Sequence, residues 1–182
     1  MKQIIKFSLD FLIFIIIFIF TNFSFSGCVN NKGEIVGLPL KFESIEQEKI
    51  SNRGGFFEGI SPTLIIIKEY PLANNLSKVF NDEGDYALAN INYSRDMAIV
   101  VFQGWKGSIE YGITIQKIIF IDNSVQIYAN VVEPTPGKEE HPMEISPYHL
   151  VKLDKTLLSG KEITFELIIN QNVEFTTTQI ID

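Results

Sequence analysis

Hydrophobic residues along most of this chain recur with the two-residue period of β-strands. Residues 125–131 and 163–169 alternate apolar and polar side chains, which is typical of strands with one face in solvent. Residues 97–102 are apolar at every position, which predicts a strand covered on both faces. Residues 63–69 and 146–153 favour two more strands, and a weaker pattern at 41–50 fits an edge strand.

Turn-forming residues separate these segments and predict two hairpins. Asp122-Asn123-Ser124 lies between the apolar segments 111–115 and 125–131, and Asn170-Gln171-Asn172 precedes a returning strand at 173–177. Both connections are short enough to join antiparallel neighbours.

One segment follows a helical period instead. Leu72, Leu76, Val79 and Phe80 fall on one face of a helix over 71–81, which we expect to end at Asn81-Asp82-Glu83-Gly84. The predicted fold class is mainly β (α+β), with about eight mostly antiparallel strands in a sandwich or barrel-like sheet and one amphipathic helix near 71–81.

The N-terminus resembles a bacterial lipoprotein signal. Lys2 and Lys6 precede an apolar run at 11–20, and small residues lead to Cys28, the only cysteine of the chain. We therefore expect a signal peptide at 1–27, lipidation of Cys28, a flexible tether at 28–40 and a single domain at 41–182. An uncleaved anchor and an ordinary cleaved signal are the alternatives, although ten apolar residues fall short of the ~20 that span a bilayer.

Charge excludes some partners. The chain has 15 basic and 22 acidic residues and no basic run in its body, so nothing points to nucleic acid. We expect the membrane to be reached through the lipid anchor at Cys28.

Residues suited to catalysis are few, and we predict neither an enzyme nor a bound cofactor or metal. Glu139-Glu140-His141 lies on a Pro-rich loop, where adjacent side chains diverge instead of converging on an ion. His149 would serve as a base only if a serine or an acid met it in space, and a hydrogen-bonded strand histidine is the simpler interpretation. Ser108 lacks the strand–nucleophile–helix context of a hydrolase.

Trp105, the only tryptophan, lies between glycines at the break after residue 102. Its ring either folds over the end of the sheet or anchors a partner, as exposed aromatic residues often do at interfaces.

Four segments of the chain occur in a distinctive order and spacing: Arg95–Gly104, Tyr111–Ile115, Glu133–Gly137 and Ser146–Val151. Together they resemble the C-terminal domain of the protease complex subunit PrcB family, and the resemblance spans about Ile65 to Lys155. Family members commonly have a Pro-Thr-Gly-Gly-like turn where this chain has Gly107-Ser108-Ile109-Glu110. The family's namesake associates with a surface protease and supports its production or stability, so the resemblance implies a non-catalytic accessory role.

The leading hypothesis is an exported, lipid-anchored protein-binding module of the bacterial cell envelope, facing away from the cytoplasm. Its partner would be an exported or surface protease or another exported protein. The alternative is an exported protease inhibitor or small hydrolase that uses the same loops, 103–110 and 133–142. The candidate partner-binding residues are Trp105, Lys106, Ser108, Tyr111 and His141.

Overall fold

The computed structural model of this protein describes residues 37–48, 59–70, 76, 79–137 and 141–182. All of them belong to one compact unit, Val36–Asp182. The expected signal peptide and Cys28 lie outside the described residues, as does most of the expected tether.

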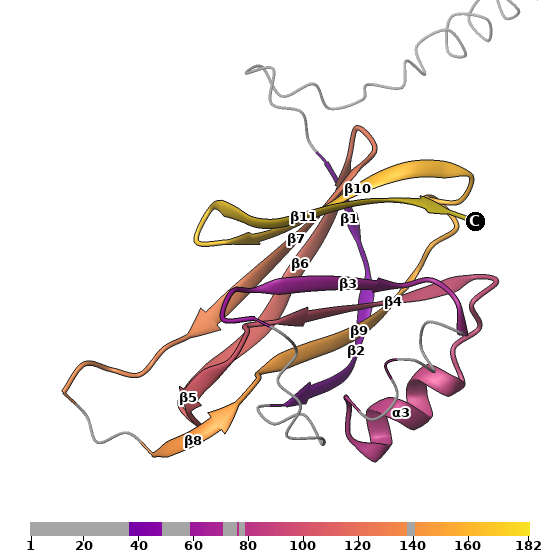
Figure 1. Ribbon diagram of the computed structural model, residues 1–182. Coiled ribbons are helices and arrows are strands. Elements are labelled where there is room, and N and C mark those ends of the chain that lie inside the picture. Colours follow the sequence, from indigo (N-terminus) through magenta and orange to yellow (C-terminus); the bar gives the residue numbers. More distant parts are fainter. Residues whose placement is uncertain (1–36, 49–58, 71–75, 77–78, 138–140) are drawn as a thin grey trace, which may run out of the picture. The chain divides into compact units, whose positions relative to one another are not determined.

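The described residues form two main sheets that stack as a sandwich (Figure 1). Sheet A has the strand order β1-β6-β7-β10-β11, and its pairs are antiparallel except for β7 with β10. Its strands are β1 (Leu38–Leu40), β6 (Gly112–Ile121), β7 (Ser124–Val132), β10 (Lys161–Ile169) and β11 (Asn172–Ile181).

Sheet B is antiparallel throughout and has the order β2-β9-β4-β3. A separate two-stranded sheet, here called the ribbon, pairs β5 with β8. The strands of sheet B are β2 (Phe42–Glu48), β3 (Thr63–Ile67), β4 (Asp96–Phe102) and β9 (Tyr148–Asp154), and those of the ribbon are β5 (Lys106–Ser108) and β8 (Pro142–Ile145).

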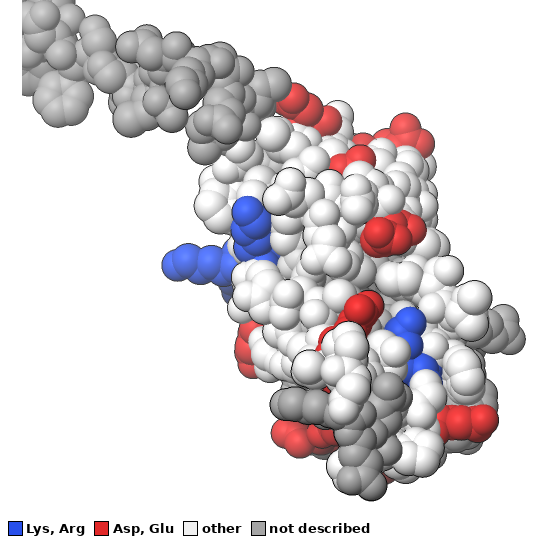
Figure 2. Space-filling model, turned by 90° about the vertical axis from the view of Figure 1, so that its left-hand side faces the viewer, with Lys and Arg blue, Asp and Glu red and all other residues white. Residues whose placement is uncertain are grey.

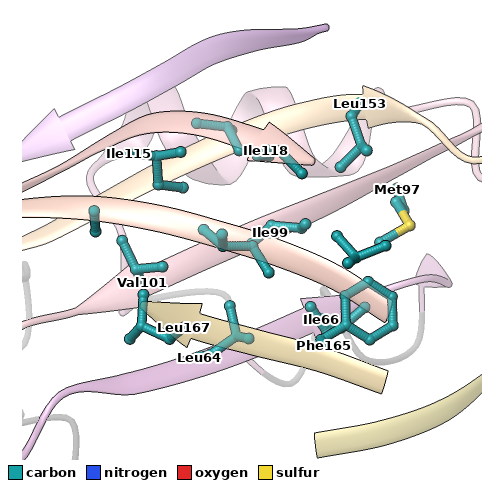
Figure 3. Packing of buried hydrophobic residues seen from close by; sticks show 14 of the residues in the cluster. Leu64, Ile66, Met97, Ile99, Val101, Ile115, Ile118, Leu153, Phe165 and Leu167 are labelled. Atoms are coloured by element: carbon teal, nitrogen blue, oxygen red, sulfur yellow. The ribbon is translucent and has the colours of Figure 1, made fainter. Parts of the chain in front are cut away.

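The main core fills the space between sheets A and B with aliphatic side chains, Met97 and the ring of Phe165 (Figure 3). Ile99 and Val101 of β4 meet Ile115 of β6 and Leu167 of β10 there, and all four are at most 3% exposed. Burial of each such side chain contributes roughly 1.5–3 kcal/mol. The sandwich therefore has a hydrophobic core without help from a disulfide.

A second cluster covers the outer face of sheet B. Ala98, Val100 and Phe102 of β4 pack there with Phe80 and with Leu88 of helix α3 (Asp82–Ala89). The expectation that residues 97–102 are covered on both faces is confirmed, because β4 contributes alternate side chains to the two clusters.

Both predicted hairpins are present. The β6–β7 turn holds Asp122 and Asn123 at φ 47° and 65°, and the β10–β11 turn holds Asn170 and Gln171 at φ 51° and 68°. Successive positive φ angles match the two-residue turns that suit the twist of antiparallel strands. The predicted fold class, mainly β with mostly antiparallel strands, is confirmed.

Two boundaries differ from the expectation. Residues 38–40, expected in the tether, form β1 at the edge of sheet A, where Pro39 needs no ladder donor on its solvent side. The helix expected at 71–81 lies largely outside the described residues, and α3 begins at Asp82, where we expected a helix to end. Gly84 does not end a helix as we expected, because it lies within α3 and packs against Glu46.

Candidate functional site

The ribbon brings together the two segments that the sequence marked as binding loops. Lys106 pairs with Ile145 and Ser108 with Pro142, with a bulge at Gly107 between the two pairs. We expected residues 103–110 to form a loop, but this segment contains β5. The second expected loop, 133–142, ends at the first residue of β8. Pairing of β5 with β8 makes the two segments one structure, which extends beyond the sandwich (Figure 1).

The base of the ribbon is fixed by backbone contacts. The Gln103 amide N–H donates to the Pro147 carbonyl at 2.9 Å, and the Trp105 amide donates to the Gly59 carbonyl at 2.9 Å. Between them Gly104 has φ +84°, and a Cβ there would lie 2.7 Å from the Ile60 carbonyl carbon. Glycine suits this position because it adopts a positive φ without strain and has no Cβ to clash with Ile60. The start of β5 can therefore lie against residues 59–60.

Trp105 and Lys106 lie along this contact with residues 59–60, which we call the seam. Trp105 is 38% exposed, so its ring is partly covered and partly available. The Lys106 ammonium donates to the Ile60 carbonyl at 3.3 Å and lies 5.6 Å from the centre of the Tyr111 ring. Lys106 and Tyr111, both candidate residues, therefore come together as a cation–π pair at the edge of the ribbon.

Ser108, Glu110 and His141 form a hydrogen-bonded chain across the ribbon. The Ser108 hydroxyl donates to one Glu110 carboxylate oxygen, and the other lies 2.7 Å from Nδ1 of His141. The His141 backbone N–H also donates to this carboxylate, at 3.3 Å. The hydrogen bond from His141 lowers the pKa of Glu110, so the carboxylate stays charged and joins the two sides of the ribbon.

This order of groups differs from that of a hydrolase triad. In a triad the imidazole lies between the hydroxyl and the acid, whereas here Glu110 lies between Ser108 and His141. Ser108 is 1% exposed, so it positions Glu110 and does not itself reach the surface. Among the predicted contact residues, His141 is exposed and Ser108 is not.

His149 lies next to the hydroxyl of Ser44, but the tautomer of its ring is the wrong one for accepting a proton from that hydroxyl. Its Nδ1 accepts from the Ile115 backbone N–H at 2.9 Å, and its Nε2 lies 2.8 Å from the Ser44 hydroxyl. Because Nδ1 accepts, Nε2 carries the proton and donates to Ser44. Burial lowers the pKa of His149, so the ring stays neutral and links three strands as a structural residue.

A buried acid that the sequence did not single out lies on the other face of sheet B. A bulge between Ser44 and Glu46 turns Glu46 toward α3, where Tyr148 donates to its carboxylate at 2.9 Å. Burial raises the pKa of Glu46 in spite of this hydrogen bond and those from Asn81. No sequence pattern marks a bulge, so only the paired strands reveal the site.

The described ranges contain neither a metal-binding cluster nor a helix that could cross a membrane. No group of three His, Cys, Asp or Glu side chains in them is placed to hold a metal ion. None of the described helices has the length and apolar character needed to cross a membrane.

Comparison of the chain with protein-family models, with curated proteins and with solved structures found no match. The resemblance to the PrcB family consequently rests on the four sequence segments alone.

Proposed function

We propose that this protein is an exported, lipid-anchored binding module that serves as a non-catalytic accessory or assembly subunit of a surface protease complex. The observation that carries the proposal is the ribbon, in which two strands pair at one end of the sandwich although their partners, such as Ser108 and Pro142, are 34 or more positions apart in the chain. The ribbon supplies the surface, and the family resemblance supplies the class of partner.

The surface around the ribbon suits a protein partner. Exposed apolar side chains lie on it or at its base: Ile60, Trp105, Val132 and Met143. In the view from the ribbon's side, most of the described surface belongs to residues other than Lys, Arg, Asp and Glu, with a few scattered charged side chains (Figure 2). Interfaces are typically built in this way, with few charges at the centre and aromatic or Met side chains as anchors.

The ribbon is also pre-ordered for binding. The Glu110–His141 contact and the seam at residues 59–60 hold β5 and β8 in place before a partner arrives. A surface that is already ordered loses less conformational entropy on association.

Membrane attachment is a separate part of the proposal, and a separate experiment tests it. Cys28→Ser should abolish labelling by an alkyne-tagged fatty acid, while the wild-type chain takes the label. An unlabelled wild-type chain would remove lipid anchoring from the proposal and leave the binding role untouched.

The binding role is tested by a charge introduced into the ribbon. Met143→Asp should weaken capture of the co-expressed surface protease by about tenfold or more, because a buried, unpaired carboxylate opposes the interface. Leu157→Asp is the matched control, since Leu157 is 53% exposed against 45% for Met143 and follows β9, away from the ribbon.

The direction of the effect on the protease separates the alternatives. An accessory subunit raises the yield of active protease, whereas an inhibitor lowers the activity of protease already made. Equal capture of the protease by wild type and Met143→Asp would overturn the assignment of the ribbon as the binding surface. Hydrolytic activity of the purified chain, lost in Ser108→Ala, would overturn the non-catalytic role.

A further inference from the structure

A pocket of about 420 Å³ opens at the end of sheet B opposite to the ribbon. Phe102 pairs with both Thr63 and Tyr148 near the ribbon, so the far ends of β3, β4 and β9 meet at the other end of the sheet. Residues flanking those far ends form the pocket walls: Lys68, Tyr70, Tyr93, Ser94 and Lys155. Its volume is in the ordinary range for small-molecule sites.

Lys155 places a buried positive charge in this pocket. The residue is 4% exposed, and its backbone N–H is held by the Arg95 carbonyl at 2.9 Å. Within the described part of the chain, its ammonium has one hydrogen bond, a long one of 3.5 Å to the Lys68 carbonyl, and no carboxylate within 4.0 Å. An ammonium has three donors, and burying it without a counter-charge is costly.

The second lysine of the pocket is already engaged. The Lys68 ammonium donates to the Ile180 carbonyl at 2.7 Å and lies 4.0 Å from the Asp182 carboxylate. Of the two lysines in the pocket, Lys155 therefore has the ammonium with more donors to spare, and Ser94 lines the same pocket. Tyr70 and Tyr93 are the aromatic residues of the lining, and the Tyr93 hydroxyl is fixed by donating to the Leu88 carbonyl at 3.0 Å.

The acids of the pocket limit which anion fits. Glu69 and Asp182 also line it, and both are exposed to solvent. The Asp182 carboxylate lies next to the Lys68 ammonium, and the Glu69 carboxylate repels a doubly charged anion more strongly than a singly charged one. The described pocket residues include no arginine to provide the planar fork that favours phosphate.

We propose that this pocket binds the carboxylate of a small molecule, with Lys155 as the charged anchor, Ser94 as a neutral donor and the tyrosine rings against the apolar body of the ligand. This site is independent of the ribbon and of the proposed protease partner.

The test is a titration of the full chain in detergent with benzoate, a singly charged aromatic carboxylate, and in parallel with inorganic phosphate. Benzoate should shift the backbone amide resonances of Ser94 and Lys155, and phosphate should not. Lys155→Met, which keeps the length of the side chain and removes its charge, should weaken benzoate binding about tenfold or more. Lys117→Met is the control, because Lys117 lies on β6 over the Tyr128 ring.

Three results would overturn the proposal: no benzoate shift at these residues in the wild-type chain, equal benzoate binding by Lys155→Met, or a stronger response to phosphate. The wild-type titration gives an answer even if Lys155→Met does not fold, and Ser94→Ala then provides a milder variant that should weaken binding about threefold. Met143→Asp should bind benzoate as the wild type does, which separates this site from the ribbon.

Discussion

Gly84→Ala should destabilise this protein although alanine favours helices. Gly84 lies inside α3, where replacing glycine by alanine gains up to ~1 kcal/mol. A Cβ at this position would lie 2.1 Å from the Glu46 Oε2 atom and 3.0 Å from Phe80 Cβ. The Glu46 carboxylate would have to leave, and this breaks its 2.9 Å hydrogen bond from Tyr148.

The size of the effect follows from what is lost. A hydrogen bond to a charged group contributes about 1.5–3 kcal/mol, and Tyr148 is fully buried, so its hydroxyl would find no water in exchange. Subtracting the helix gain leaves a net loss of about 0.5–2 kcal/mol in the free energy of unfolding. In a Glu46→Ala background the obstruction by the carboxylate is gone and only the 3.0 Å contact with Phe80 Cβ remains, so the same substitution should instead stabilise, by less than ~1 kcal/mol.

Urea denaturation of the four chains of this double-mutant cycle gives the coupling between Gly84 and Glu46. Trp105, the only tryptophan, is a convenient fluorescence probe. We expect a coupling of about 1.5–3 kcal/mol, which is the contribution of the lost hydrogen bond. If Gly84→Ala stabilised the wild type, or changed both backgrounds equally, the close packing of Glu46 on α3 would be wrong.

Three further substitutions test the ribbon and the sandwich. Gly104→Ala should lower the free energy of unfolding by about 2 kcal/mol, because of the positive φ and the contact with the Ile60 backbone. Gly107→Ala is the control: no atom lies within 4 Å of its Cβ position, so it should change stability by less than ~0.5 kcal/mol. Equal effects of the two substitutions in urea denaturation would refute the seam. His141→Ala should raise the pKa of Glu110 measured by carboxyl NMR titration. Because the folded-state pKa of Glu110 is lowered, its contribution to stability is present above its ordinary pKa of 4.5 and is lost as pH falls through the folded value, and the variant should lack this acid sensitivity. His149→Leu should destabilise by about 2 kcal/mol, because it leaves a buried strand N–H without an acceptor; a neutral result in thermal denaturation would show that water replaces the ring.

Local patterns predicted much of this fold. The hairpin turns were predictable because Asp122 and Asn123, or Asn170 and Gln171, determine backbone geometry within four residues. The burial of β4 followed from an unbroken apolar run. The start of α3 was not predictable, since the glycine inside it is required by a side chain 38 positions earlier, Glu46.

The candidate site depended on pairing that sequence alone does not determine. Trp105, Lys106, Tyr111 and His141 were singled out for their residue types and their place between strands, and the structure assembles them around the ribbon. Glu110 was not singled out, because a carboxylate in a turn looks like any solvated charge until its partner 31 positions later is known. Contacts of this kind come from tertiary structure and leave no periodic trace.

The parallel pair of β7 and β10 has a consequence for how the chain folds. Each of the two hairpins of sheet A forms from residues close together in the chain. The two hairpins join only when β10 pairs with β7, which brings Thr164 next to Ser124, 40 positions earlier. The intervening chain contributes β8 to the ribbon and β9 to the interior of sheet B, so this one crossover connection contains strands of sheet B and of the ribbon. Closing such a long loop before its contacts form is slow. We expect a rate-limiting step at the β7–β10 junction, after which both ends of the molecule become ordered together.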